Sequence, residues 1–228
     1  MVTLLLVRHG EAEGNPEHRF IGQTDVPLTA VGHHQVRVLT ERLIGLPITR
    51  VVSSDLGRCL ATVSPAAAAL GLEVTTDRRL REVDNGAWNG LLAEEIEARW
   101  PDLFRRYRSG EDVLRPQGED WSAVGGRVAE ALGEVIDASQ AHDVVLVGTH
   151  AGPILATILR LTDGAPRNVF SGAFGSVDHC SLTVFTGAQM RLVAFNDTGH
   201  TADLTQPSWI SETRPVHPSS SNSGGTGM

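Results

Sequence analysis

The sequence contains no lysine, so all 19 basic side chains among its 228 residues are arginines. Walker-type phosphate loops, Schiff-base catalysis and pyridoxal attachment each need a lysine, so the sequence excludes these classes. Arginine, by contrast, suits bidentate recognition of phosphate and carboxylate groups. Any strong positive charge that the chain offers a ligand is therefore guanidinium.

Cysteine is also scarce, with only Cys59 and Cys180 present. Two cysteines are too few for a disulfide framework, and they lack metal-ligand spacing, so we expect no structural metal. No apolar run is long enough to span a bilayer, and the short apolar run at the amino terminus lacks the features of a signal peptide. These absences predict a cytoplasmic protein with no membrane partner.

Acidic residues outnumber basic ones, and the formal net charge is -8 at pH 7. Such a field disfavours nucleic acid and anionic lipid as partners, and no basic stripe is present. A small anion can still bind in a locally positive cleft, because nearby groups set the field there. The hydrophobic content of 41% fits one globular domain, which we place at residues 1–204, followed by a flexible tail at 205–228.

Apolar runs that are typical of buried strands alternate with helical patterns along the chain. Strands are expected at 3–7, 50–53, 73–76 and 143–148, and helices at 29–43, 55–70, 120–138 and from Gly152-Pro153 onward. Pro65 should break or kink the second of these regions. CSLTVF and MRLVAF flank TGAQ as a hairpin, and short helices between Leu80 and Arg115 form an insertion or lid. The order predicts an α/β three-layer sandwich, whose mostly parallel sheet has helices on both faces and an antiparallel edge.

Charged and imidazole side chains follow the predicted buried strands where each strand ends. Arg8 and His9 follow LLLV, His150 follows VVLVGT, and Arg58 lies one helical turn beyond RVVSS. In such sheets ligands bind at the carboxyl ends of the strands, so these side chains should face one rim. Two imidazoles and two guanidiniums at one point predict an anion site.

Each of these residues has an ordinary structural interpretation when it is taken alone. His9 and His150 could be hydrogen-bonded structural histidines, and Arg8 and Arg58 could be surface cations. Glu82 could form a surface pair with Arg79 or Arg81. Because the two histidines and Arg8 and Arg58 all lie at the ends of strands, we favour a role in an anion site for these four residues.

Five segments of the sequence, in order, resemble the motifs of the histidine phosphatase superfamily, also called the phosphoglycerate mutase-like family. They are LVRHGEAEGN, RFIGQTDVPLTAVGHHQ, SSDLGRCLAT, LREVDNGAWNG and VGTHAGP, and the resemblance covers Leu4 to His200. It implies a phosphoglycerate mutase-like fold. It also implies enzymes that transfer a phosphoryl group through a phosphohistidine without a metal or cofactor.

The resemblance further implies a role for each matched residue. His9 would be the nucleophile, Glu82 the general acid, and Arg8, Arg58 and His150 the groups that hold the phosphoryl oxygens, with Asn15 lining the phosphate pocket. His9 must then attack through an unprotonated nitrogen, which Arg8 and Arg58 would favour, while a carbonyl on the other nitrogen would fix the tautomer. The sequence departs from the family pattern at Ala12, which replaces a serine or threonine hydroxyl, and at Cys59 and Ala151.

These expectations favour a phosphoric monoester hydrolase of the histidine acid phosphatase type that acts on a small phosphorylated metabolite. A phosphoglycerate-type mutase is the first alternative, although WNGLLAEEI after Glu82 lacks the basic residues usual in mutases. A non-catalytic phospho-ligand binding module is the second. Specificity is expected to depend on Trp88 to Arg115 and Phe170 to Asp178, and the oligomeric state stays open.

Overall fold

A six-stranded sheet with strand order β3-β2-β4-β1-β5-β6 forms the centre of the protein. The computed structural model describes residues 1–162, 168–171 and 176–204, so the expected tail at 205–228 lies outside the described residues. The strands are β1 (Thr3–Arg8), β2 (Arg50–Ser53), β3 (Val74–Thr76), β4 (Val144–Thr149), β5 (Leu182–Thr186) and β6 (Arg191–Asp197). The first four strands run parallel, while β5 pairs antiparallel with both β1 and β6. The predicted parallel sheet and edge hairpin are therefore confirmed.

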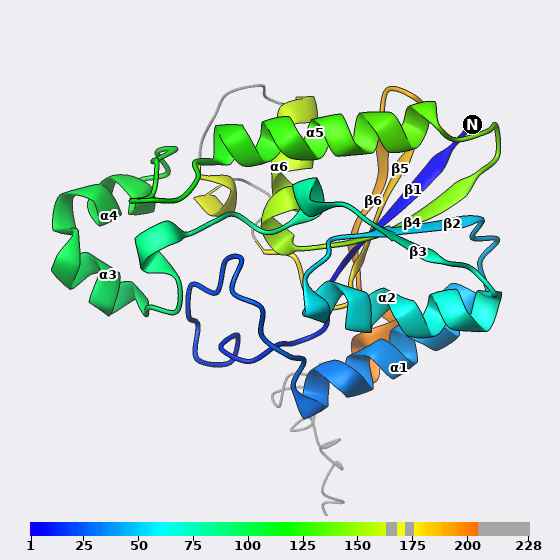
Figure 1. Ribbon diagram of the computed structural model, residues 1–228, viewed down its shortest axis with the longest axis horizontal. Coiled ribbons are helices and arrows are strands. Elements are labelled where there is room, and N and C mark those ends of the chain that lie inside the picture. The colour runs from blue at the N-terminus through cyan, green and yellow to red at the C-terminus, as the bar shows by residue number, and fades with distance from the viewer. Residues whose placement is uncertain (163–167, 172–175, 205–228) are drawn as a thin grey trace, which may run out of the picture.

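Helices cover both faces of this sheet, with α1 (Ala30–Ile44) and α2 (Gly57–Leu70) on one face and α5 (Trp121–Asp137) and α6 (Ala151–Thr162) on the other (Figure 1). Side chains that alternate along β1 belong to different cores. Leu4 and Leu6 pack in the core that includes α5 and α6, whereas Leu5 and Val7 pack in the core that includes α1 and α2. This alternation is what a strand buried on both faces requires, and it confirms the three-layer sandwich.

The helix boundaries follow from local capping chemistry. Thr29 accepts a hydrogen bond from the Gly32 N–H at 3.0 Å before α1, and Asp120 caps α5 through the Ala123 N–H at 2.8 Å. Helix α2 continues past Pro65 to Leu70, so the expected break is wrong. Buried neighbours such as Val63 and Ala66 pack the turns on both sides of the proline, which compensates for the one hydrogen bond that proline cannot donate.

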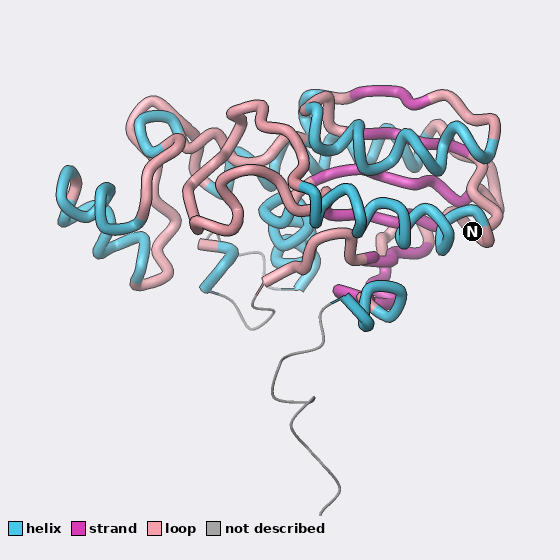
Figure 2. Tube along the Cα trace, turned by 90° about the horizontal axis from the view of Figure 1, so that it is seen from below, coloured by secondary structure: helices cyan, strands magenta, loops and turns pink. Residues whose placement is uncertain are grey.

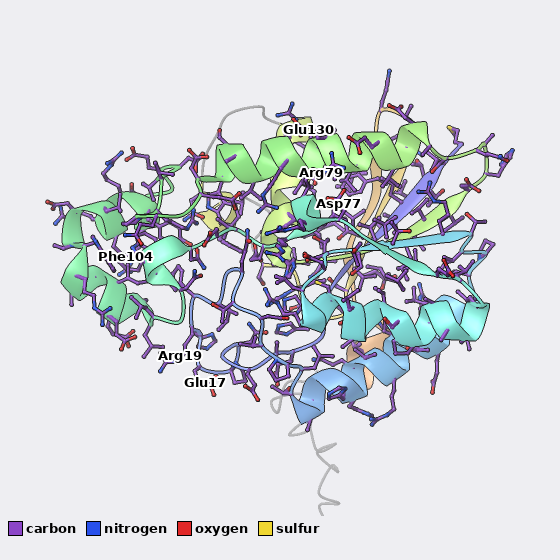
Figure 3. All side chains as sticks on the ribbon, viewed as in Figure 1. Glu17, Arg19, Asp77, Arg79, Phe104 and Glu130 are labelled. Carbon is purple, nitrogen blue, oxygen red and sulfur yellow. The ribbon has the colours of Figure 1, made fainter. Side chains whose placement is uncertain are left out.

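The insertion predicted between Leu80 and Arg115 contains α3 (Ala93–Arg99) and α4 (Pro101–Arg108), which lie beyond the end of the sheet in Figure 1. It has its own small core around Trp88, Ile96 and Phe104, the last of which is labelled in Figure 3. Short 3₁₀ helices occur at Arg78–Leu80, Gly86–Trp88, Val169–Ser171 and Gly199–Leu204. Figure 2 shows that loops gather between this insertion and the strands.

Among the helices of the described residues, none is long and apolar enough to cross a membrane.

Leu39 and Val31 on α1 provide a matched test of the packing. The Leu39 side chain is 0% exposed and that of Val31 is 52% exposed. We expect Leu39→Ala to lower the free energy of unfolding by about 2–5 kcal/mol, because truncation leaves a cavity in a dense core. Val31→Ala should change it by less than about 0.5 kcal/mol. Urea denaturation of both variants checks this, and equal effects would contradict the described burial.

Candidate active site

The register of three parallel strands brings their carboxyl ends to one point. Arg8 pairs with Thr149 across β1 and β4, and the His9 N–H donates to the Thr149 carbonyl at 3.0 Å. His150 is the next residue, so the His9 and His150 ring centroids lie 5.1 Å apart with an interplanar angle of 67°. The two imidazoles therefore lie side by side at this edge of the sheet, as the sequence predicts, although only His9 lines the cavity described below.

The hydrogen bonds of His9 define which ring nitrogen carries the proton. Its Nδ1 lies 2.7 Å from the Gly10 carbonyl oxygen, which can only accept, so Nδ1 carries the hydrogen. Its Nε2 accepts from the Nε–H of Arg58 at 3.3 Å and therefore presents a lone pair. Burial, followed by the charges of Arg58 and Arg8, lowers the pKa of His9 well below 6.5. The imidazole is thus neutral, as the sequence predicted, although burial rather than arginine charge is the largest cause.

Arg58 lies in the first turn of α2, where the chain has just left β2. Its guanidinium donates to the carbonyls of Thr24 at 2.8 Å and Gly22 at 2.7 Å, as well as to His9. These bonds use three of its five N–H groups and fix its plane against the imidazole. The side chain is buried, and one N–H on each terminal nitrogen remains for an anion.

Arg8 is partly buried and lines the cavity together with His9. One terminal nitrogen donates to the carbonyl of Val177, while Nε has no hydrogen-bond partner among the described residues. Burial is the largest cause that lowers the pKa of Arg8, and the charges of Glu82 and Asp178 oppose it. No ion pair between described residues involves Arg8 or Arg58. The site therefore combines a buried cation, Arg58, with a partly buried one, Arg8, and a bound anion would stabilise both.

Glu82 lines the same cavity as His9, Arg8 and Arg58. Its carboxylate accepts from the N–H of Val83 at 2.9 Å and from that of Gly152, at the start of α6, at 3.2 Å. A Cβ at position 152 would lie 2.1 Å from Glu82 Oε1, so a glycine is needed there for this approach.

Arg79 and Arg81, the surface partners that the sequence offered for Glu82, pair with other residues. Arg79 binds Asp77 and Glu134, and Arg81 binds Asp55; Asp77 and Arg79 are labelled in Figure 3. The interpretation of Glu82 as a partner of these arginines is therefore wrong.

Arg127 on α5 holds the segment that carries Glu82. Its guanidinium donates to the carbonyls of Arg79 at 2.7 Å, Arg81 at 2.6 Å and Glu82 at 2.9 Å. Both carboxylate oxygens of Glu119 accept from the same guanidinium. The sequence pattern of α5 gave no sign of this role, because it depends on a contact across 45 residues or more.

His150 is fully buried behind His9 and does not line the cavity in this structure. Its Nε2 lies 3.0 Å from the hydroxyl oxygen of Ser54 and 3.3 Å from the sulfur of Cys59. Burial is the main cause that lowers its pKa well below 6.5, and Arg58 adds to the effect. Cys59 therefore touches the site, although it is inert, because burial raises the pKa of its thiol to about 12.

The cavity has a volume of about 600 Å³ and opens beside His9. Asn15, Ala12 and Arg19 line it from the loop that follows β1, and Figure 3 labels Arg19. Trp121, Tyr107, Arg115 and Phe170 form the walls farther along. Arg105 and Arg106 do not line the cavity and pair with Asp102 and Glu111 at the surface. The cavity exceeds the size of a phosphate group and suits a small phosphorylated molecule.

His179 lines the cavity, although its sequence pattern did not mark it as a site residue. Its ring centroid lies 5.8 Å from that of His9, and its Nε2 lies 3.1 Å from Asn15 Oδ1. Asn15 Oδ1 also accepts from the Ala12 N–H at 3.0 Å, so the amide N–H groups of Asn15 are the part left for a ligand. The sequence alone showed only a histidine before a hairpin strand, and that pattern carries no signal for this contact.

A family model described as histidine phosphatase superfamily (branch 1) matches residues 4–198. The protein therefore belongs to the histidine phosphatase superfamily. A probable phosphoglycerate mutase GpmB from Serratia proteamaculans is 37% identical over 186 residues, which cover 80% of this chain and 84% of that protein. The family contains phosphatases and mutases, and the resemblance inferred from the motifs is confirmed.

Solved structures give the same fold. Bacillus stearothermophilus YhfR matches with a TM-score of 0.80 at 28% identity, covering 88% of this chain and 99% of that chain. A mycobacterial glucosyl-3-phosphoglycerate phosphatase, solved with VO3, matches with a TM-score of 0.77 at 28% identity, covering 86% and 99%. The phosphoglycerate mutase-like fold is thereby confirmed.

The buried histidines predict how stability depends on pH. Burial, with a smaller effect from Arg8, lowers the pKa of His179 to about 3, so the unfolded chain binds a proton there before the native protein does. Stability should therefore fall with decreasing pH by about 1.4 kcal/mol per pH unit for this group, between about pH 6 and pH 4.5.

His179→Asn should reduce the measured slope of unfolding free energy against pH by that amount. Chemical denaturation at several pH values measures it, with His33→Asn on the exposed face of α1 as the matched control. An unchanged slope in His179→Asn would show that this imidazole is protonated as readily in the folded protein.

Proposed function

We propose that this protein is a metal-independent phosphomonoesterase that hydrolyses a small phosphorylated metabolite through a phosphohistidine on His9. Glu82 is the general acid and base, and Arg8, Arg58 and Asn15 bind the phosphoryl oxygens. We assign the same role to His150, which requires its ring, buried behind His9 in this structure, to gain access to the cavity when substrate binds. The observation that carries this proposal is the lone pair on His9 Nε2, held beside the buried guanidinium of Arg58 in the cavity that Arg8 and Glu82 also line. These are the parts that phosphoryl transfer asks for, namely an aligned nucleophile and stabilised charge on the equatorial oxygens.

In the first step, the Nε2 lone pair forms a bond to phosphorus as the bond from phosphorus to the leaving oxygen breaks. Glu82 in its protonated form gives its proton to that oxygen, and the alcohol leaves. The Arg58 Nε–H, which faces Nε2 at 3.3 Å, is then free to donate to an equatorial oxygen. The Nδ1–H of His9 keeps its hydrogen bond to the Gly10 carbonyl throughout. This bond stabilises the positive charge that develops on the imidazole ring.

In the second step, water attacks phosphorus and the bond to Nε2 breaks, which returns the lone pair to His9. The Glu82 carboxylate takes a proton from the water and so regains the proton that it lost. The sum is one ester and one water converted to one alcohol and one phosphate. The guanidiniums of Arg8 and Arg58 offer the charge stabilisation that a metal ion supplies in other phosphotransferases.

The names of the similar proteins include both phosphatases and mutases, so they support either activity. Relatives at 37% identity are named probable phosphoglycerate mutases, whereas a structural neighbour at 28% identity is a glucosyl-3-phosphoglycerate phosphatase. We favour hydrolysis because WNGLLAEEI, the segment that follows Glu82, lacks the basic residues that are usual in the mutases that the sequence resembles, and the chain contains no lysine.

Substitution of the nucleophile and of the acid tests the mechanism. His9→Ala should reduce phosphate release from phosphate esters by at least about 10³-fold, because the covalent route is lost. Glu82→Gln should reduce turnover of an alkyl phosphate by about 10²–10⁴-fold, and of 4-nitrophenyl phosphate by much less, because a phenolate leaves without a proton.

Glu94→Gln, an exposed position on α3, is the matched control for the acid. Full activity in His9→Ala would remove His9 as the nucleophile. Absence of phosphate release in the wild type across a panel of phosphorylated metabolites would favour a binding module.

The products distinguish the phosphatase from a mutase. With 3-phosphoglycerate as substrate and catalytic bisphosphoglycerate present, we expect glycerate and inorganic phosphate. Phosphorus NMR follows both outcomes in one tube. Accumulation of 2-phosphoglycerate at a rate above that of phosphate release would show that the mutase interpretation is correct.

A further inference from the structure

Glu82 lies in a stretch of chain that has no regular secondary structure. Residues 82–85 precede the 3₁₀ helix Gly86–Trp88 and follow the 3₁₀ helix Arg78–Leu80, against which α5 packs (Figure 1). No helix or strand ladder fixes the backbone groups of these residues, which must find hydrogen-bond partners elsewhere. The position of Glu82 accordingly depends on the side chains that bind this stretch.

Arg127 on α5 uses all five of its N–H groups on this part of the chain and on one carboxylate. Nη1 donates to the carbonyls of Arg79 and Arg81, and Nη2 donates to that of Glu82. The other Nη2 hydrogen and the Nε hydrogen bind the two carboxylate oxygens of Glu119, each at 2.9 Å. A guanidinium has five N–H groups, so none is left for a ligand, and Arg127 is not among the described residues that line the cavity. Any effect of these hydrogen bonds on the reaction is therefore transmitted by the residues that Arg127 holds.

Glu119 holds the same stretch on the other side of Glu82. Its Oε2 accepts from the Asp84 N–H at 2.9 Å, and its own N–H donates to the Asp84 carbonyl at 2.8 Å. The side chains of Arg127 and Glu119 are 17% and 23% exposed, so solvent screens their ion pair only weakly. Together the two residues bind the chain before and after Glu82.

One peptide unit connects this pair to the carboxylate of Glu82. The carbonyl of Glu82 and the N–H of Val83 belong to the same peptide, which is planar. Arg127 and Gln23 donate to that carbonyl at 2.9 Å and 3.0 Å. The N–H of Val83 in turn donates to Glu82 Oε1 at 2.9 Å. A fixed carbonyl therefore fixes the direction of the N–H that orients the carboxylate.

We propose that Arg127 and Glu119 are positioning residues for the general acid, because they hold the Glu82–Val83 peptide and so keep the Glu82 carboxyl group within reach of the leaving oxygen. Their role rests on the proposed function, in which Glu82 protonates that oxygen. Proton transfer needs a donor at hydrogen-bond distance, and a displacement of about 1 Å can lower a rate by about 100-fold. The loss should fall on leaving groups that need a proton.

The charge of Arg127 offers a second route to the site. Burial and then Arg58 are the larger causes that lower the pKa of His150, and the charge of Arg127 adds to them. Lysine at position 127 keeps this charge but lacks the planar fork that binds three carbonyls. Arg127→Lys therefore separates position from charge, and Glu119→Gln weakens the pair while Arg127 stays in place.

Benzyl phosphate and 4-nitrophenyl phosphate form a matched substrate pair of similar size. The benzyl alkoxide needs a proton to leave, whereas 4-nitrophenolate does not. We take the ratio of kcat/KM for 4-nitrophenyl phosphate to that for benzyl phosphate, because kcat/KM does not include hydrolysis of the phosphohistidine. Glu82→Gln should raise this ratio, since it removes the acid.

Arg127→Lys should lower kcat/KM for benzyl phosphate by about 10- to 100-fold and leave that for 4-nitrophenyl phosphate within about threefold. Glu119→Gln should raise the ratio in the same direction, which covers the case in which the lysine variant does not fold. Arg106→Lys is the matched control, because its guanidinium pairs with Glu111 at the surface, and it should leave the ratio unchanged.

Combination with Glu82→Gln gives a second readout that a purely structural role would not produce. In that background Arg127→Lys should change kcat/KM for benzyl phosphate by less than about threefold, because the group that it positions is no longer an acid. A loss as large as that in the wild-type background would show that Arg127 acts by another route and would overturn the proposal.

An unchanged ratio in both Arg127→Lys and Glu119→Gln, or an equal loss on the two substrates, would also overturn the positioning role if Glu82→Gln raises the ratio. An unchanged ratio in Glu82→Gln would instead refute Glu82 as the acid, and the positioning role would fall with it. The failure of the proposed function is thus measured in Glu82→Gln, and that of the positioning role in the other two variants.

Discussion

The contact of His9 with Gly10 on one side and Arg58 on the other is the interaction on which the rest of the site depends. The Gly10 carbonyl holds the proton on Nδ1, and the Arg58 N–H marks the lone pair on Nε2. In water a free imidazole exchanges tautomers and takes up a proton below about pH 6.5. Burial in this cavity makes protonation costly, so the ring stays neutral and keeps one orientation.

The strand order of the sheet brings together the residues that make this contact. Parallel pairing of β1 with β4 places His9 beside His150, and parallel pairing of β2 with β4 brings the start of α2, and thus Arg58, to the same edge. On the opposite face, Arg127 from α5 fixes the chain on both sides of Glu82, and Gly152 admits its carboxylate at the start of α6. Burial of the Arg58 guanidinium without an acidic partner destabilises the free protein, and a phosphate ligand supplies the missing negative charge.

The order of strands and helices could be predicted from apolar runs, and the meeting of His9, Arg58 and His150 followed from where those runs end. The break that was one of the two expected effects of Pro65 does not occur, because a propensity for breaking helices says nothing of the packing around the proline. His179 and Arg127 act through contacts between segments distant in sequence, and no local spacing encodes such contacts. The sequence pattern therefore predicts the residues at the centre of the site. The residues that orient these side chains and line the rest of the cavity can be identified only from the folded structure.

Measurement of the protonation state of His9 is the most direct test of the proposed neutral nucleophile. Nitrogen-15 NMR of the histidine side chains, with His9 assigned by comparison with His9→Ala, reports the tautomer and charge of its ring. The account predicts a neutral ring with hydrogen on Nδ1 and none on Nε2 at about pH 6.5, where a free imidazole is half protonated. A ring that carries its proton on Nε2, or an imidazolium at about pH 6.5, would contradict it.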